Sequence, residues 1–173
     1  LLLIPVLNVK AIETSDYITA DENVSTGKNY DHSYMLVGDN VKSNAKVNGI
    51  LFSIGDDMTL ETENEYSFIL GNQVSLNSFK NDKDSFIFGY DVNLNKDSLI
   101  GRDLIIFGYD VTISGVITQN IIIYADNVKF ENATIGKDVH INASTITFEN
   151  NVSINGDLEY NENAKVTGLD LIN

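Results

Sequence analysis

The sequence predicts an all-β protein: a single-stranded, right-handed parallel β-helix (β-solenoid) with rungs of roughly 17 residues. Two observations support this fold class. One short pattern returns along most of the chain: apolar, any, apolar, then glycine or a small polar residue, two polar residues, and again apolar, any, apolar. In addition, the helical period of 3.6 residues is missing throughout, whereas the period of two that marks half-buried strands recurs.

Each copy of the pattern predicts a strand, a tight bend and a second strand. The bend begins with glycine in six of nine copies, and Asp or Asn precedes the second strand in eight of nine. Glycine enters positive φ at no cost, and Asp and Asn hydrogen-bond to nearby backbone. The copies are MLVGDNVKS from Met35, FSIGDDMTL from Phe52, FILGNQVSL from Phe68, FIFGYDVNL from Phe86, IIFGYDVTI from Ile105, IIYADNVKF from Ile122, ATIGKDVHI from Ala133, ITFENNVSI from Ile146 and LEYNENAKV from Leu158.

The spacing of the bends predicts coils with three short strands and three corners. The first apolar residue after the bend lies at 41, 58, 74, 92, 111 and 128, which gives steps of 17, 16, 18, 19 and 17 residues. A second corner type lies between these bends, as in Ile113-Ser114-Gly115-Val116. After residue 128 the steps fall to 11, 13 and 12. Either the rungs narrow there, or a different corner carries the same motif.

Three segments are expected. Residues 1–11 are apolar, too short to span a bilayer, and resemble the tail of a secretory signal peptide, with a buried first strand as the alternative. Residues 12–33 are more polar and are expected to form a lead-in, cap or partial first rung. Residues 34–173 are assigned to the β-helix domain. The signal predicts an exported protein, on the extracytoplasmic side of the membrane or in the cell envelope.

The charge and the motifs argue against several functions. The net charge of −14, with scattered basic residues, argues against a nucleic-acid partner. No nucleotide-binding or metalloprotease motif occurs, so we expect no catalytic residue, no cofactor and no metal site. His32 and His140 are interpreted as surface residues. The Asp/Asn column at the bends could hold Ca²⁺, but we interpret its members as turn residues. Tyr90 and Tyr109 should stack outside the coil, as a structural ladder or a sugar-binding platform.

One family resembles this chain over the run from Lys42 to Gly168. The closest stretches are Asp97–Ile106, Gly108–Gly115 and Ile154–Tyr160, and they resemble the bactofilins, or polymer-forming cytoskeletal proteins, especially their exported, membrane-anchored relatives. The resemblance implies a right-handed β-helix that stacks end to end without a nucleotide and serves as a scaffold. It also implies membrane anchoring, which here would need a C-terminal segment beyond Asn173.

The sequence thus predicts a non-enzymatic structural or scaffolding protein whose partner is a further copy of itself, added head to tail through the coil ends. A surface adhesin or carbohydrate-binding β-helix is the main alternative. A polysaccharide lyase or hydrolase is another, although such sites usually place basic residues beside carboxylates and Arg102 is the only arginine. A hexapeptide acyltransferase would need a six-residue period, which is not evident.

Overall fold

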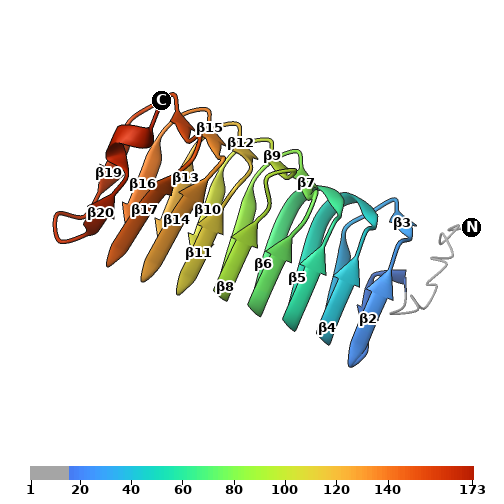
Figure 1. The fold of residues 1–173 in the computed structure, drawn as a ribbon. Coiled ribbons are helices and arrows are strands. Elements are labelled where there is room, and N and C mark those ends of the chain that lie inside the picture. Colours follow the sequence, from blue (N-terminus) through green and yellow to red (C-terminus); the bar gives the residue numbers. More distant parts are fainter. Residues whose placement is uncertain (1–15) are drawn as a thin grey trace, which may run out of the picture.

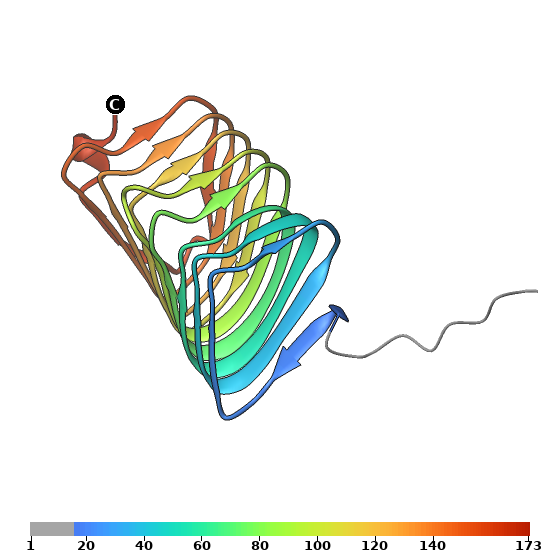
Figure 2. The ribbon, with the colours of Figure 1, turned by 90° about the vertical axis from the view of Figure 1, so that its right-hand side faces the viewer.

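The computed structural model describes residues 16–173, so the segment assigned to a signal peptide lies outside the described residues. The described chain winds into a parallel β-helix of about nine turns, which confirms the predicted fold class. Figure 1 shows the turns stacked side by side from β2 to β20. Viewed from its N-terminal end in Figure 2, the coil turns clockwise as it recedes, and it is therefore right-handed.

Each turn has three sides, which we call faces A, B and C. Face A contains β1 (Ile18–Ala20), parts of β4 (Tyr34–Ser43), β5 (Lys46–Leu60), β6 (Glu63–Leu76) and β8 (Ser85–Leu94), and then β10 (Leu104–Phe107), β13 (Ile121–Tyr124), β16 (Val139–Asn142) and β19 (Leu158–Tyr160). Face B contains β2 (Asn23–Thr26), the ends of β4, β5, β6 and β8, and then β11 (Asp110–Ile113), β14 (Asn127–Glu131), β17 (Thr145–Glu149) and β20 (Lys165–Thr167). Face C contains β3 (Asn29–Tyr30), the starts of β5 and β6, and then β7 (Lys80–Asn81), β9 (Leu99–Ile100), β12 (Val116–Ile117), β15 (Thr134–Ile135) and β18 (Ser153–Ile154).

The pairing between turns shows whether the rungs become shorter after residue 128 or the motif occurs at another corner. Val128 pairs with Ile146, and Ile146 pairs with Val166, so face B continues to the last turn with full-length rungs. Val139, which by the motif alone is the next step after Val128, lies on face A instead. The same sequence motif therefore occurs at a different corner of the coil, and the rungs do not become shorter.

The coil also extends upstream of the boundary expected at residue 34. β1, β2 and β3 form one strand on each face, and each pairs in parallel with the following turn. Residues 18–30 are thus a rung with the same three sides as the others, within the interval 12–33 where we expected a cap or partial rung. The low apolar content of this stretch hides the rung in the sequence, because Thr19 and Thr26 occupy inward positions.

Aliphatic side chains fill the interior in columns, one residue for each turn. One of the two inward columns of face B consists of like side chains, which are Val24, Val41, Met58, Val74, Val92, Val111, Val128 and Ile146, all of them buried. Phe130 and Phe148 stack inside the same face with ring centroids 5.2 Å apart. Close packing of these columns is the main source of stability, since the chain has no cysteine.

The inside and outside positions of face A differ from the predicted pattern. The apolar-any-apolar triplet suggested that its two outer members are buried, but the structure buries the middle one: Ile69 in FIL and Ile87 in FIF have no exposed surface. Phe68 and Leu70 point outward. The alternation is interrupted at the Gly71 corner, so the phase read from face B does not carry back to face A.

A short helix and an isolated bridge complete the path of the final turn. The 3-10 helix η2 (Leu169–Leu171) follows Gly168, which has a φ of 78°. Ile172 then bridges to Val152 in parallel, and this bridge takes the place of a strand on face C. Within residues 16–173, β19 and β20 each pair on one side only, with β16 and β17.

Candidate interaction surfaces

The most distinctive surface is on the outside of face A. Two outward columns of large apolar side chains run along six successive turns, and we call them together the apolar band. The first column is Met35, Phe52, Phe68, Phe86, Ile105 and Ile122, and the second is Val37, Ile54, Leu70, Phe88, Phe107 and Tyr124. None of these twelve side chains carries a charge, although the chain has a net charge of −14.

The rings of the band are ordered by the pairing of the strands. Phe107 stacks on Phe88 with centroids 5.1 Å apart and on Tyr124 with centroids 5.3 Å apart, and both pairs are within 6° of parallel. Phe68 stacks on Phe86 at 5.0 Å. Because in-register strands repeat about every 4.8 Å, equivalent rings are brought to stacking distance. The band is therefore a flat, ordered apolar surface.

Sequence reasoning missed the band, although a signal for it was present. The first strand of several copies is apolar at every position, as in FIL, FIF and IIF. A continuous apolar run is typical of strands that are covered on both faces, whereas strict alternation is typical of strands with one wet face. The second strands, such as VSL and VNL, alternate and keep a polar outward residue. This difference from the first strands could have indicated that the outer side of the first strands is apolar.

Tyr90 and Tyr109 lie at the corner that follows the band. Their rings stack with centroids 4.8 Å apart and 6° from parallel, and both side chains are exposed, which confirms the predicted stack outside the coil. The negative charge of Asp126 raises the pKa of Tyr109, with a further contribution from Tyr90. Because the two rings face each other, they present mainly their edges to solvent. A sugar-binding platform would be limited to the outermost ring faces.

The Asp and Asn side chains at the corners connect successive turns by hydrogen bonds. At the corner before face A, Asp103 Oδ1 accepts hydrogen bonds from the backbone N–H of Asn120 at 3.0 Å and from its Nδ2 at 2.8 Å. Asn120 Oδ1 in turn accepts from the N–H of Asp138, whose Oδ1 accepts from the N–H of Asp157. At the corner before face B, Asn127 Nδ2 donates to Asp110 Oδ1 at 2.8 Å.

These hydrogen bonds explain the residue type at the corner before face A. A carboxylate or amide oxygen pairs with a backbone N–H of the next turn, which strand pairing alone would leave without a partner at the corner. Within residues 16–173, no three acidic or histidine side chains lie close enough to hold a metal ion together. In the Asp/Asn column before face B, side chains of successive turns contact each other, as Asn127 and Asp110 do. Our interpretation of this column as turn residues stays a prediction.

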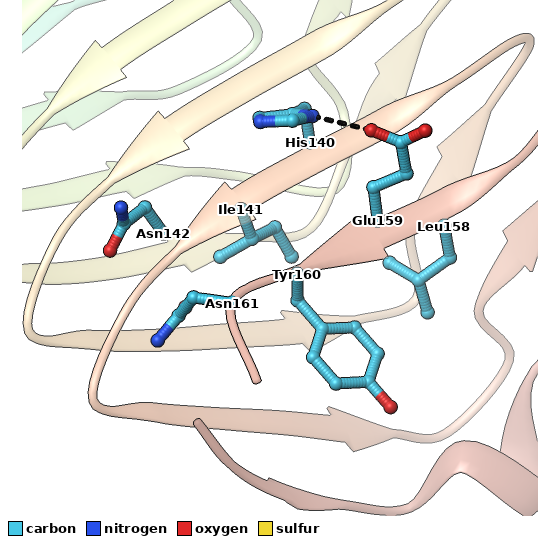
Figure 3. A pocket seen from close by; sticks show the side chains of 7 residues that line it. All are labelled: His140, Ile141, Asn142, Leu158, Glu159, Tyr160 and Asn161. Carbon is cyan, nitrogen blue, oxygen red and sulfur yellow. Dashed lines mark hydrogen bonds and ion pairs between the residues drawn. The ribbon is translucent and has the colours of Figure 1, made fainter. Parts of the chain in front are cut away.

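The polar residues that the sequence singled out are distributed over the coil. His140 continues the first column of the band beyond Ile122, and its Nδ1 lies 3.0 Å from Glu159 Oε2. Figure 3 shows this pair at the edge of a shallow hollow on the last turns of face A. His32, near the other end of the coil, packs against Tyr17 with centroids 4.4 Å apart and the rings tilted by 35°. Arg102 Nε lies 3.3 Å from Asp84 Oδ1.

The fold and this surface define a class: a right-handed β-solenoid with an apolar outer band. No protein family, no curated protein and no solved structure matches the chain. Within the described residues, no helix has the length and apolar character needed to cross a bilayer.

Proposed function

We propose that this protein is a non-catalytic scaffold of the cell envelope, similar to the bactofilins, that assembles end to end through its coil ends. The observation that supports the proposal is the incomplete burial of the last turn. Val139 and Ile146 have no exposed surface, whereas their partners in the same inward columns of the last turn, Leu158 and Val166, are only partly buried. A further turn stacked on this end would bury them.

The backbone of the last turn also has hydrogen-bonding groups without a strand partner. β19 and β20 present the N–H and C=O groups of one strand edge along the coil axis, within the part of the chain that the structure describes. An open edge of this kind is a template for adding a further strand. At the other end of residues 16–173, β1, β2 and β3 likewise pair on one side only. A second copy added there would continue the parallel pairing of all three faces.

The test compares an inward and an outward side chain of the same terminal strand. Val166 points inward and is partly buried, whereas its neighbour Thr167 is exposed. For the 173-residue chain, sedimentation velocity and electron microscopy should show particles that lengthen with protein concentration. Val166→Asp should shorten them and Thr167→Asp, with the same added charge, should not. A strictly monomeric wild-type particle at high concentration would overturn the proposal.

The alternative, a carbohydrate-binding surface protein, is favoured by one observation, the exposed pair of Tyr90 and Tyr109. Binding on a glycan array that is lost when both tyrosines are replaced by alanine would support this alternative. The location at the envelope is tested separately, by fractionation of cells that express the natural gene.

A further inference from the structure

The apolar band has more exposed surface than a solitary acidic protein usually shows. With roughly 200 Å² for the accessible area of a large apolar side chain, its twelve members leave on the order of 700 Å² exposed. The largest apolar patch on a typical monomer is roughly 300–600 Å², and a standard protein interface covers about 800 Å² on each partner. The band therefore has the size of one side of a stable interface.

We propose that the band is a lateral interface, in which a second copy of this chain packs its face A against the first. Two apolar sheet faces pack naturally at about 10 Å, with the mean strand directions nearly aligned. A two-fold axis through the middle of the band, between Leu70 and Phe88, places each band on its own equivalent. The interface lies on the side of the coil, so it is distinct from the coil ends that our proposed function uses.

The charge distribution favours a second copy over other partners. Each copy carries a net charge of −14, and two copies avoid close contact between like charges only where the surface is uncharged, as in the band. A basic partner would be attracted to the acidic remainder of the surface and not to the band. An anionic membrane would repel the chain as a whole.

The charges at the margin of the band lead to a second, independent prediction, which concerns the salt dependence of the dimer. Asp39 and Asp56 follow the corner glycines on one side of the band. Asp103 lies at the corner on the other side, next to Asp84, whose charge is paired with Arg102. Two copies packed face to face would bring these acidic margins close together. Because salt screens repulsion between exposed charges, the dimer should become tighter as ionic strength rises from about 0.05 M to 0.5 M.

The test uses two leucines of similar exposure on different faces. Leu70 is 52% exposed in the middle of the band, and Leu99 is 42% exposed on the outside of face C. In sedimentation equilibrium of the 173-residue chain, Leu70→Asp should weaken the lateral dimer by about 100-fold, the loss typical of a residue central to an interface. Leu99→Asp should leave it unchanged, and Val166→Asp, which addresses the coil end, should also leave it unchanged.

A cross-linking experiment provides a second measurement that does not depend on affinity. Because the chain has no cysteine, Leu70→Cys and Leu99→Cys each introduce a single thiol. A short bismaleimide should link Leu70→Cys into a covalent dimer and leave Leu99→Cys monomeric. Equal linking of both variants, a wild-type chain whose only association is abolished by Val166→Asp, or flotation with phosphatidylcholine vesicles that Leu70→Asp abolishes would overturn the proposal.

Discussion

Two leucines of β6 that look equivalent in the sequence should differ sharply in their contribution to stability. Leu70 and Leu76 occupy the third and last apolar positions of FILGNQVSL, so the repeat pattern treats them alike. In the structure Leu76 has no exposed surface, whereas Leu70 points outward and is 52% exposed. Replacing each by alanine tests whether the side chains of face A point as the structure shows.

The expected magnitudes follow from burial. Leu76→Ala removes three buried carbons, for a transfer loss of about 2.4 kcal/mol, and the cavity left behind raises the total cost to roughly 3–4 kcal/mol. Leu70→Ala removes carbons that are about half in water and leaves no closed cavity, so it should cost about 1 kcal/mol.

Equilibrium unfolding in urea, followed by circular dichroism, measures the difference. With a slope of about 2 kcal/mol/M, the midpoint should fall by 1.5–2 M for Leu76→Ala and by no more than about 0.5 M for Leu70→Ala. The protein concentration is kept where sedimentation shows a monomer, so that lateral association does not add to the effect of Leu70. Equal shifts for the two variants, or a larger shift for Leu70→Ala, would refute the inside and outside assignment of face A.

Three further changes have expected outcomes. Asp103→Ala should lower the free energy of unfolding by about 1–2 kcal/mol, because the N–H of Asn120 loses its acceptor, and Asp103→Asn should retain most of the stability in the same urea titration. Gly168→Ala should increase hydrogen exchange in the last turn, because a Cβ there would lie 2.0 Å from a backbone carbonyl oxygen and φ is positive. Asp126→Asn should lower the pKa of Tyr109 in an absorbance titration near 295 nm, since it removes the main charge that disfavours the tyrosinate. The raised pKa contributes stability below pH 10, the ordinary value, and this contribution is lost as pH rises through the folded-state pKa.

The repeated corners made much of the fold accessible from the sequence. A bend that begins with glycine and ends with Asp or Asn, returning at steps of 16 to 19 residues, is sufficient to predict a coil with three sides. The stack of Tyr90 on Tyr109 followed from the same register, since equivalent positions of adjacent turns must lie side by side. Glycine at the bends was predicted too, but the predicted reason was wrong, because among the glycines of the described residues only Gly49 and Gly168 have positive φ. The glycines at the bends instead allow a close approach of the preceding turn: a Cβ at Gly55 would lie 2.6 Å from the carbonyl oxygen of Gly38.

The apolar band and the course of the last turns could not be predicted in this way. In FIL and FIF every position is apolar, so the period of two gives no phase, and only the pairing of Ile69 with Ile87 inside the coil shows which residues face outward. Likewise, the motif at Val139 looks like a new step of face B, and only its pairing with Ile121 places it on face A. The sequence by itself determined that the chain coils and where it bends. The tertiary structure decided which side of each strand is buried, because that depends on contacts between residues a full turn apart.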